Sequence, residues 1–135
     1  MKYRVLRVLL FFSALIWGIS VFGLVLPWGK AVEVLSGFGA GAIPHDPMLE
    51  YWLRMTAGAF TGVGIFFLVL ALNPGKYANV IPLAAGLMFG EGLVLLVCGI
   101  RLGLHPFPFY ADTAACLGAG AGIMALAGEV ARGGD

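Results

Sequence analysis

The chain of 135 residues is 61% hydrophobic and 11% charged, with a mean hydropathy of +0.98 and a formal net charge of +1. A soluble domain is usually about half apolar and about a quarter charged. So short a chain has too small an interior to hide this much apolar surface from water. The small net charge leaves no basic surface for nucleic acid, so we expect no nucleic-acid partner. The composition indicates a single integral membrane domain, residues 1–135, in contact with the lipid bilayer.

Four long apolar runs divide the sequence, over residues 5–26, 51–72, 79–100 and 109–130. Each has about 20 residues or slightly more, enough at ~1.5 Å per residue to cross a hydrocarbon layer of ~30 Å. Only helices and closed barrels satisfy their backbone amides in lipid, and the sustained alternation that a barrel requires is absent. We therefore predict an all-α polytopic membrane protein, an antiparallel bundle of four transmembrane helices.

The Lys and Arg residues predict the orientation of this bundle. A cytoplasmic N-terminus leaves five basic residues inside and three outside, and cytoplasmic loops usually carry the excess. The inner set is Lys2, Arg4, Arg7, Lys76 and Arg132, and the outer set is Lys30, Arg54 and Arg101. We expect both termini to be cytoplasmic. The first run is longer than the roughly 7–15 apolar residues of a signal peptide, so we interpret it as a retained helix.

The connections between the spans differ in length. Residues 73–77 (NPGKY) predict a tight inner turn, because Pro and Gly end one helix before the next begins. The second and third spans should then be antiparallel neighbours. The longest connection is the outer loop, residues 27–50. Between Lys30 and Ser36 its apolar and polar residues separate onto two sides at helical spacing, which indicates a short helix lying in the membrane interface.

Small residues predict where the helices pack. Lipid tails give helices no hydrophobic reason to associate, so Gly residues four apart are a signal of close approach. Three consecutive spans carry such a GxxxG pair, namely Gly58 and Gly62, Gly86 and Gly90, and Gly118 and Gly122. We expect these glycines at helix contacts. The motif leaves open whether the partner helix belongs to the same chain.

One carboxylate, Glu91, lies near the middle of the third run between Gly90 and Gly92. At such depth it needs a partner, a proton or a water-filled cavity, so it is the first candidate site residue. Arg54 and Asp112 lie about one turn inside the outer ends of their spans, on faces of small residues. We expect an ion pair between them. These charges either fix the helix register or line an ion, proton or substrate pathway that opens to the outer face.

Other reactive residue types favour structural roles. Cys98 and Cys116 fall inside apolar runs at different depths, as expected of small buried side chains and not of a redox pair. Ser13, Trp17 and Ser20 form a weakly polar stripe on the first span, which we interpret as core packing. Five residues of metal-ligand types lie near the outer surface without a short motif. We expect ordinary loop residues there, and neither a metal nor a cofactor. They are His45, Asp46, Glu50, His105 and Asp112.

Leu53-Arg54-Met55 opens a Gly-rich helix, and the NPGKY segment at residues 73–77 makes the inner turn. With these two segments, the layout of four short spans resembles the DoxX-like group of small bacterial membrane proteins. The resemblance implies a multi-pass four-helix bundle in the cell inner membrane, with no defined reaction.

Three functions are compatible with this sequence. We favour a non-enzymatic membrane protein that acts as a homo-oligomer or as an accessory subunit of a membrane complex, because its helix faces are lined with glycine. The alternative is a small transporter or channel that uses Glu91, with an Arg54/Asp112 pair near its outer mouth. A second alternative is an enzyme acting on a lipid or quinone beneath the outer loop, although no nucleophile with a base is visible and no residue is a catalytic candidate. The first two differ in whether Glu91 faces a hydrated cavity or a dry helix contact.

Overall fold

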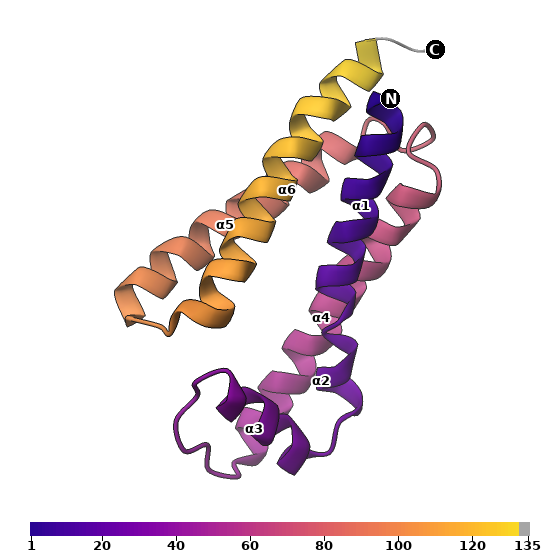
Figure 1. The fold of residues 1–135 in the computed structure, drawn as a ribbon. Helices are drawn as coiled ribbons and strands as arrows, with labels where there is room; N and C mark the ends of the chain where they lie inside the picture. The colour runs from indigo at the N-terminus through magenta and orange to yellow at the C-terminus, as the bar shows by residue number, and fades with distance from the viewer. Residues whose placement is uncertain (133–135) are drawn as a thin grey trace.

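The computed structural model describes the backbone of residues 1–132 and the side chains of residues 1–128. The described chain is helical, without a strand (Figure 1). The helices are α1 (Lys2–Gly18), α2 (Val21–Val25), α3 (Trp28–Gly37), α4 (Pro47–Leu72), α5 (Ile81–Leu102) and α6 (Pro106–Arg132). Four stretches are long and apolar enough to cross a membrane: Lys2–Val25, Pro47–Leu72, Ile81–Leu102 and Pro106–Gly128. The predicted all-α fold is confirmed, while the Arg132 side chain, counted among the inner charges, lies outside the described side chains.

The helices form two hairpins, with α1 packed along α4 and α5 packed along α6. The main contact between the hairpins is that of α1 with α6, near the end of the bundle where α1 begins and α6 ends (Figure 1). From this termini end the hairpins diverge toward the opposite end, which carries α3 and which we call the α3 end. α4 and α5 run in opposite directions, as expected, and both contribute to the buried core at the termini end (Figure 1). Beyond that core α5 packs along α6 and not along α4, because their connection, residues 73–80, is long enough to carry α5 away from α4.

Glycine allows the backbones of α1 and α4 to touch. A Cβ added to Gly64 would lie 2.5 Å from the backbone nitrogen of Gly18 and 3.0 Å from the carbonyl oxygen of Ala14. A side chain at position 64 would therefore push the two helices apart, because the atoms in its way belong to rigid backbone. At the termini end of this contact, the Arg7 Nε donates a hydrogen bond of 3.0 Å to the carbonyl oxygen of Ala71, in the last turn of α4.

The same kind of contact joins α5 to α6. A Cβ on Gly120 would lie 2.9 Å from the backbone nitrogen of Phe89, and one on Gly92 would lie 2.8 Å from the Leu117 side chain. Gly99 is covered by the ring of Phe109. Three glycines spread along the hairpin thus hold the two helices close over most of their length.

The glycines of the GxxxG pairs mostly do not make these contacts. An added Cβ would meet none of the described residues within 4 Å at four of the six positions, which are Gly62, Gly86, Gly90 and Gly118. Gly58 and Gly122 do face neighbours, at 3.6 Å from Leu24 and 3.1 Å from Leu9. Two of the six glycines therefore lie at a helix contact within the described chain, and a partner outside the chain stays a prediction for the other four. A spacing of four residues marks one side of a helix but does not say which side meets its neighbour.

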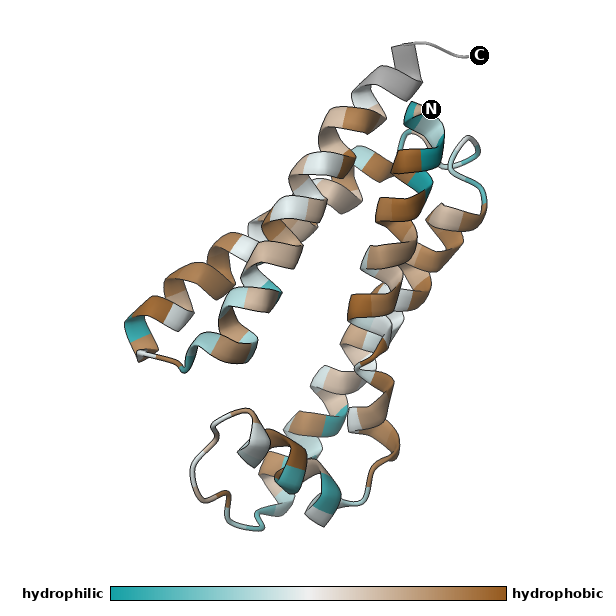
Figure 2. Cartoon of the chain, viewed as in Figure 1, coloured by the Kyte–Doolittle hydropathy of each residue, from teal (hydrophilic) through white to brown (hydrophobic). Residues whose placement is uncertain are grey.

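The core shared by the two hairpins lies toward the termini end. Leu10, Ala85 and Ile123 are fully buried there, from α1, α5 and α6, and Phe67 of α4 is 2% exposed. Large apolar side chains cover the outside of the helices, as a surface that faces lipid requires, and hydrophilic residues gather at helix ends and connections (Figure 2). Of the two cysteines, Cys116 is buried as expected, whereas Cys98 is exposed on the outside of α5.

Local signals explain how the α3 end is built. The predicted short helix is confirmed as α3, although it begins at Trp28, directly after Pro27. α4 begins four residues earlier than the predicted start at Tyr51, because the Asp46 Oδ1 accepts hydrogen bonds from the backbone nitrogens of Met48 (2.7 Å) and Leu49 (3.4 Å). An aspartate that accepts from these two amides is a strong helix start.

Candidate functional site

A cavity of about 410 Å³ lies between the two hairpins, on the α3 side of the shared core. All four long helices and the end of α3 contribute to its lining, including Trp17 of α1, Phe60 of α4 and Phe38 just after α3. Most of the lining is apolar. The ionisable carboxyl groups bordering it are those of Glu91 and Asp112. The divergence of the hairpins therefore opens onto a space with two acids in an apolar surround.

Glu91 borders this cavity from the middle of α5. It is half-buried, and it also borders a second cavity of about 310 Å³ toward the termini end, beside Phe67 and Met88. Among the described residues no hydrogen bond or ion pair reaches its carboxyl group. The sequence left a dry contact and a cavity as alternatives for this residue, and the structure places it at a cavity.

Asp112 is the second carboxyl group of the cavity, one turn from Cys116 on α6. It also borders a cavity of about 340 Å³ that reaches His105 at the α5–α6 connection. No ion pair forms between Asp112 and any described basic residue. Both carboxyl groups thus come from the α5–α6 hairpin and border the same space without a cation.

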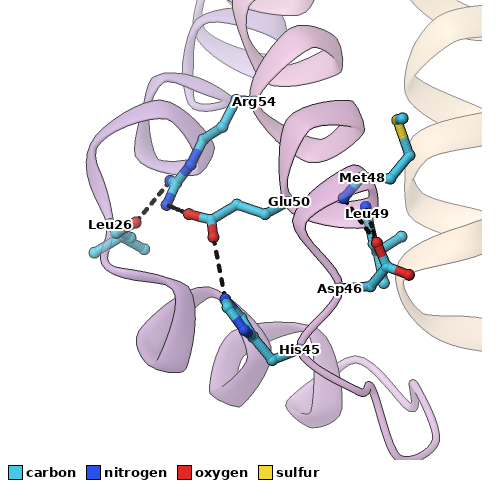
Figure 3. Close-up of polar contacts among 7 residues, drawn as sticks. All are labelled: Leu26, His45, Asp46, Met48, Leu49, Glu50 and Arg54. Carbon is cyan, nitrogen blue, oxygen red and sulfur yellow. Dashed lines mark hydrogen bonds and ion pairs between the residues drawn. The ribbon is translucent and has the colours of Figure 1, made fainter.

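The expected ion pair of Arg54 with Asp112 was wrong. The Arg54 Nη1 donates to the carbonyl oxygens of Gly23 (2.8 Å) and Leu24 (3.2 Å). It also donates to the Leu26 carbonyl oxygen at 2.6 Å, and the Arg54 Nη2 donates to the Glu50 Oε1 at 2.9 Å (Figure 3). The last carbonyls of a helix have no donor within the helix. The guanidinium of Arg54 supplies donors to the end of α2, and α2 packs on α4. Its charge is therefore used within the first hairpin.

Glu50 extends this arrangement toward the outer loop. Its Oε2 lies 3.4 Å from the Nε2 of His45 (Figure 3). The His45 ring also packs edge-on against Trp28, with centroids 5.6 Å apart. His45, Glu50 and Arg54 thus connect the loop after α3 to α4 and to the end of α2. From the sequence we expected His45 and Glu50 to be ordinary loop residues. Glu50, four residues before Arg54, carried the signal of an ion pair on one helix face.

A further cavity, about 470 Å³, lies beneath α3 and adjoins the one with the two acids. Residues of α2, α3 and α4 line it, and nearly all of them are apolar; Ser20 and Thr56 are the hydroxyl-bearing exceptions. The two cavities share part of their lining, including Ser20, Phe38 and Phe60. An apolar compartment beneath α3 therefore lies directly beside an acidic one between the hairpins.

The polar stripe on the first span proves to be partly a cavity wall. Ser13 is buried and donates to the Leu9 carbonyl oxygen at 2.9 Å, as core packing requires. Trp17 and Ser20, in contrast, border the acidic cavity. The Trp17 ring packs edge-on against Phe60 with centroids 4.9 Å apart, and its Nε1 is buried without a described hydrogen-bond partner. Ser13 and Ser20, about one turn to either side of Trp17, were the sequence signal that this face of the helix does not face lipid.

Comparisons with known proteins add no relative to this picture. No protein-family model matches the chain, and neither the search of curated proteins nor that of solved structures found a match. The resemblance to the DoxX-like group stays a prediction.

Proposed function

We propose that this chain is a small membrane transporter that takes up its substrate in the cavity between the two hairpins. The observation that carries the proposal is Glu91, an unpaired carboxyl group midway along a membrane-spanning helix, bordering open space. Ionisable groups at this depth are costly, and those that line a cavity usually serve the passage of an ion, proton or substrate. A carboxyl group kept for helix register would instead meet a partner at a helix contact.

The packing of the bundle favours a transporter over a channel. The buried core at the termini end includes Leu10, Phe67 and Ile123, and it separates the cavity from that end of the bundle. A channel needs a continuous path, whereas a transporter exposes its site to one side at a time. The proposed state is open toward α3. With both termini in the cytoplasm, as we further propose, this opening faces outward across the inner membrane.

Thiol labelling tests whether position 91 meets water. Glu91→Cys would be made in a chain without Cys98 and Cys116, placed in lipid nanodiscs and treated with a charged thiol reagent that does not enter lipid. Two matched positions on α5 serve as controls: Ala85→Cys in the core, and Val94→Cys on the exposed side, which faces lipid in a bilayer. We expect fast labelling at position 91 alone, because the reactive thiolate needs water. Equal, slow labelling at all three positions would show a dry contact and overturn the proposal.

A second candidate function is assembly with another membrane helix, as a homo-oligomer or an accessory subunit. The glycines with open space beside them favour it. Gly86 and Gly90 offer one side of α5 for close approach, and a Cβ added at either position would meet none of the described residues within 4 Å. Native mass spectrometry from nanodiscs would compare the wild type with the Gly86→Leu/Gly90→Leu variant. We expect an oligomer that this variant reduces to a monomer with unchanged helicity. A wild-type monomer, or an oligomer unaffected by both leucines, would exclude assembly through this face.

The remaining alternative is an enzyme acting on a lipid or quinone. The apolar lining of the cavity beneath α3 suits the binding of such a molecule, but the described residues of that lining offer no nucleophile with a base, so we propose no reaction there.

A further inference from the structure

We propose that the two adjoining cavities form one site for a lipophilic organic cation, with a protonated amine or quaternary ammonium held by Glu91 and Asp112 and an apolar body beneath α3. This inference rests on the proposed transport function and names its substrate class. The cavities, about 410 and 470 Å³, each fall within the size range of small-molecule sites, ~300–1,000 Å³.

The charge of the site selects a cation. Glu91 and Asp112 border the acidic cavity, and no described basic side chain pairs with either. The basic residue of α4, Arg54, donates its hydrogen bonds to three carbonyl oxygens and to Glu50. Glu91 is half-buried and Asp112 is exposed, but both border a lining of mostly apolar residues, where a carboxylate without an opposite charge is costly. A ligand that brings this charge is favoured over an anion or a neutral molecule of the same shape.

Aromatic rings border the same space. Trp17 and Phe60, packed edge-on, line the acidic cavity opposite the hairpin that supplies the two acids. Organic cations are attracted to aromatic faces within ~6 Å, most strongly to tryptophan. Rings and carboxylates together suit an ammonium group that carries carbon substituents better than a small metal cation, which takes a shell of oxygen ligands.

The cavity beneath α3 determines what the rest of the ligand is. Its lining is apolar apart from Ser20 and Thr56, so it suits hydrocarbon or aromatic groups. A phospholipid with an amine head group offers the same ammonium chemistry, but it also carries a phosphate that would lie close to Glu91 and Asp112. Like charges in an apolar surround repel. We therefore infer that the ligand is a free amphiphilic amine. The experiment must distinguish it from a phospholipid with an amine head group.

Equilibrium binding of radiolabelled tetraphenylphosphonium to the full chain in phosphatidylcholine nanodiscs tests the charge. Empty nanodiscs correct for partition into lipid, and tetraphenylborate is the anion of matched shape. We expect saturable binding of the cation and none of the anion. Glu91→Gln should weaken binding at least about tenfold and Asp112→Asn about threefold, while Glu91→Asp keeps part of the affinity. Equal binding of the cation and the anion to the wild-type chain would overturn the inference. This comparison requires no variant, so it holds even if Glu91→Gln fails to fold.

The apolar compartment is tested by filling it. Val34→Trp places an indole where α3 lines the cavity, and Val32→Trp, on the same helix but outside that lining, is the matched control. We expect only Val34→Trp to weaken phosphonium binding, by about tenfold. Equal effects of the two variants, or none, would exclude the cavity beneath α3 from the site.

A final arm separates the two sources of the amine. Competition of the phosphonium by lysophosphatidylethanolamine, but not by lysophosphatidylcholine or dodecylamine, would contradict a free amine and identify a lipid ligand. Competition by dodecylamine alone supports the inference. If position 91 is labelled by the charged thiol reagent but no phosphonium binds, the substrate class is wrong while the transport proposal stands.

Discussion

The termini end and the α3 end of this bundle contrast in how four similar helices are packed. At the termini end all four spans share one buried core, whereas at the α3 end the hairpins separate and enclose cavities. Within each hairpin, glycines keep the helices in contact, as Gly64 does against Gly18 and Gly120 against Phe89. The two ends therefore differ in contacts between hairpins and not within them. A bundle of this kind can hold its fold at one end while it presents a site at the other.

Two arginines of the first hairpin, Arg7 and Arg54, lie at its two opposite ends. Arg7 donates to Ala71, at the end of α4, and Arg54 donates to Gly23, Leu24 and Leu26, at the end of α2. Each arginine supplies a donor to carbonyl groups that the partner helix cannot satisfy itself. In lipid, such a group left unsatisfied costs several kcal/mol. At both ends of the hairpin, an arginine of one helix thus donates hydrogen bonds to the last carbonyl groups of the helix beside it.

The largest expected effect comes from breaking the first hairpin. Gly64→Leu should prevent α1 and α4 from meeting, because a Cβ there lies 2.5 Å from the Gly18 backbone nitrogen. Overpacking against backbone costs about 3 kcal/mol or more. Unfolding in nanodiscs by steric trapping would measure the loss. Gly62→Leu, two residues away with nothing within 4 Å, is the control and should change stability by less than about 0.5 kcal/mol. Similar losses in both variants would mean that the two helices do not meet at Gly64.

A second, smaller effect compares the two ends directly. Ile123→Ala removes a side chain that is fully buried in the shared core and should cost about 2 kcal/mol or more. Leu95→Ala removes a side chain that borders the cavities and should cost less than about 1 kcal/mol, because the site is already open. The same unfolding assay measures both. Equal costs would indicate that the α3 end is as tightly packed as the termini end.

The smallest effect is local. Arg54→Gln should leave the carbonyls of Leu24 and Leu26 without a charged donor and loosen α2, at a cost of about 1–2 kcal/mol confined to that end. Hydrogen exchange of residues 21–26 should rise about tenfold, while exchange in the core around Ile123 stays unchanged. Arg54→Lys is the matched variant: it keeps the charge but not the planar fork, and it should restore only part of the protection. Unaltered exchange over residues 21–26 in both variants would contradict the capping role.

Several features followed from the sequence alone because they depend on residues close together in the chain. The length and hydropathy of four runs predicted the spans, the spacing around Lys30 predicted α3, and the depth of Glu91 singled out the one carboxyl group midway along a span. Each of these inferences uses a helical period or a membrane thickness, and both are local measures.

The tertiary structure decided which faces of those helices meet. The hairpins pair α1 with α4 and α5 with α6, the contacts use Gly64, Gly92 and Gly120 instead of most GxxxG glycines, and Arg54 pairs with Glu50 and backbone carbonyls instead of Asp112. In lipid, small side chains permit close approach at many places along a helix, and the sum of packing over all helices selects among them. Glu91 illustrates the division: its depth follows from the sequence, but the cavity beside it exists only because the two hairpins diverge.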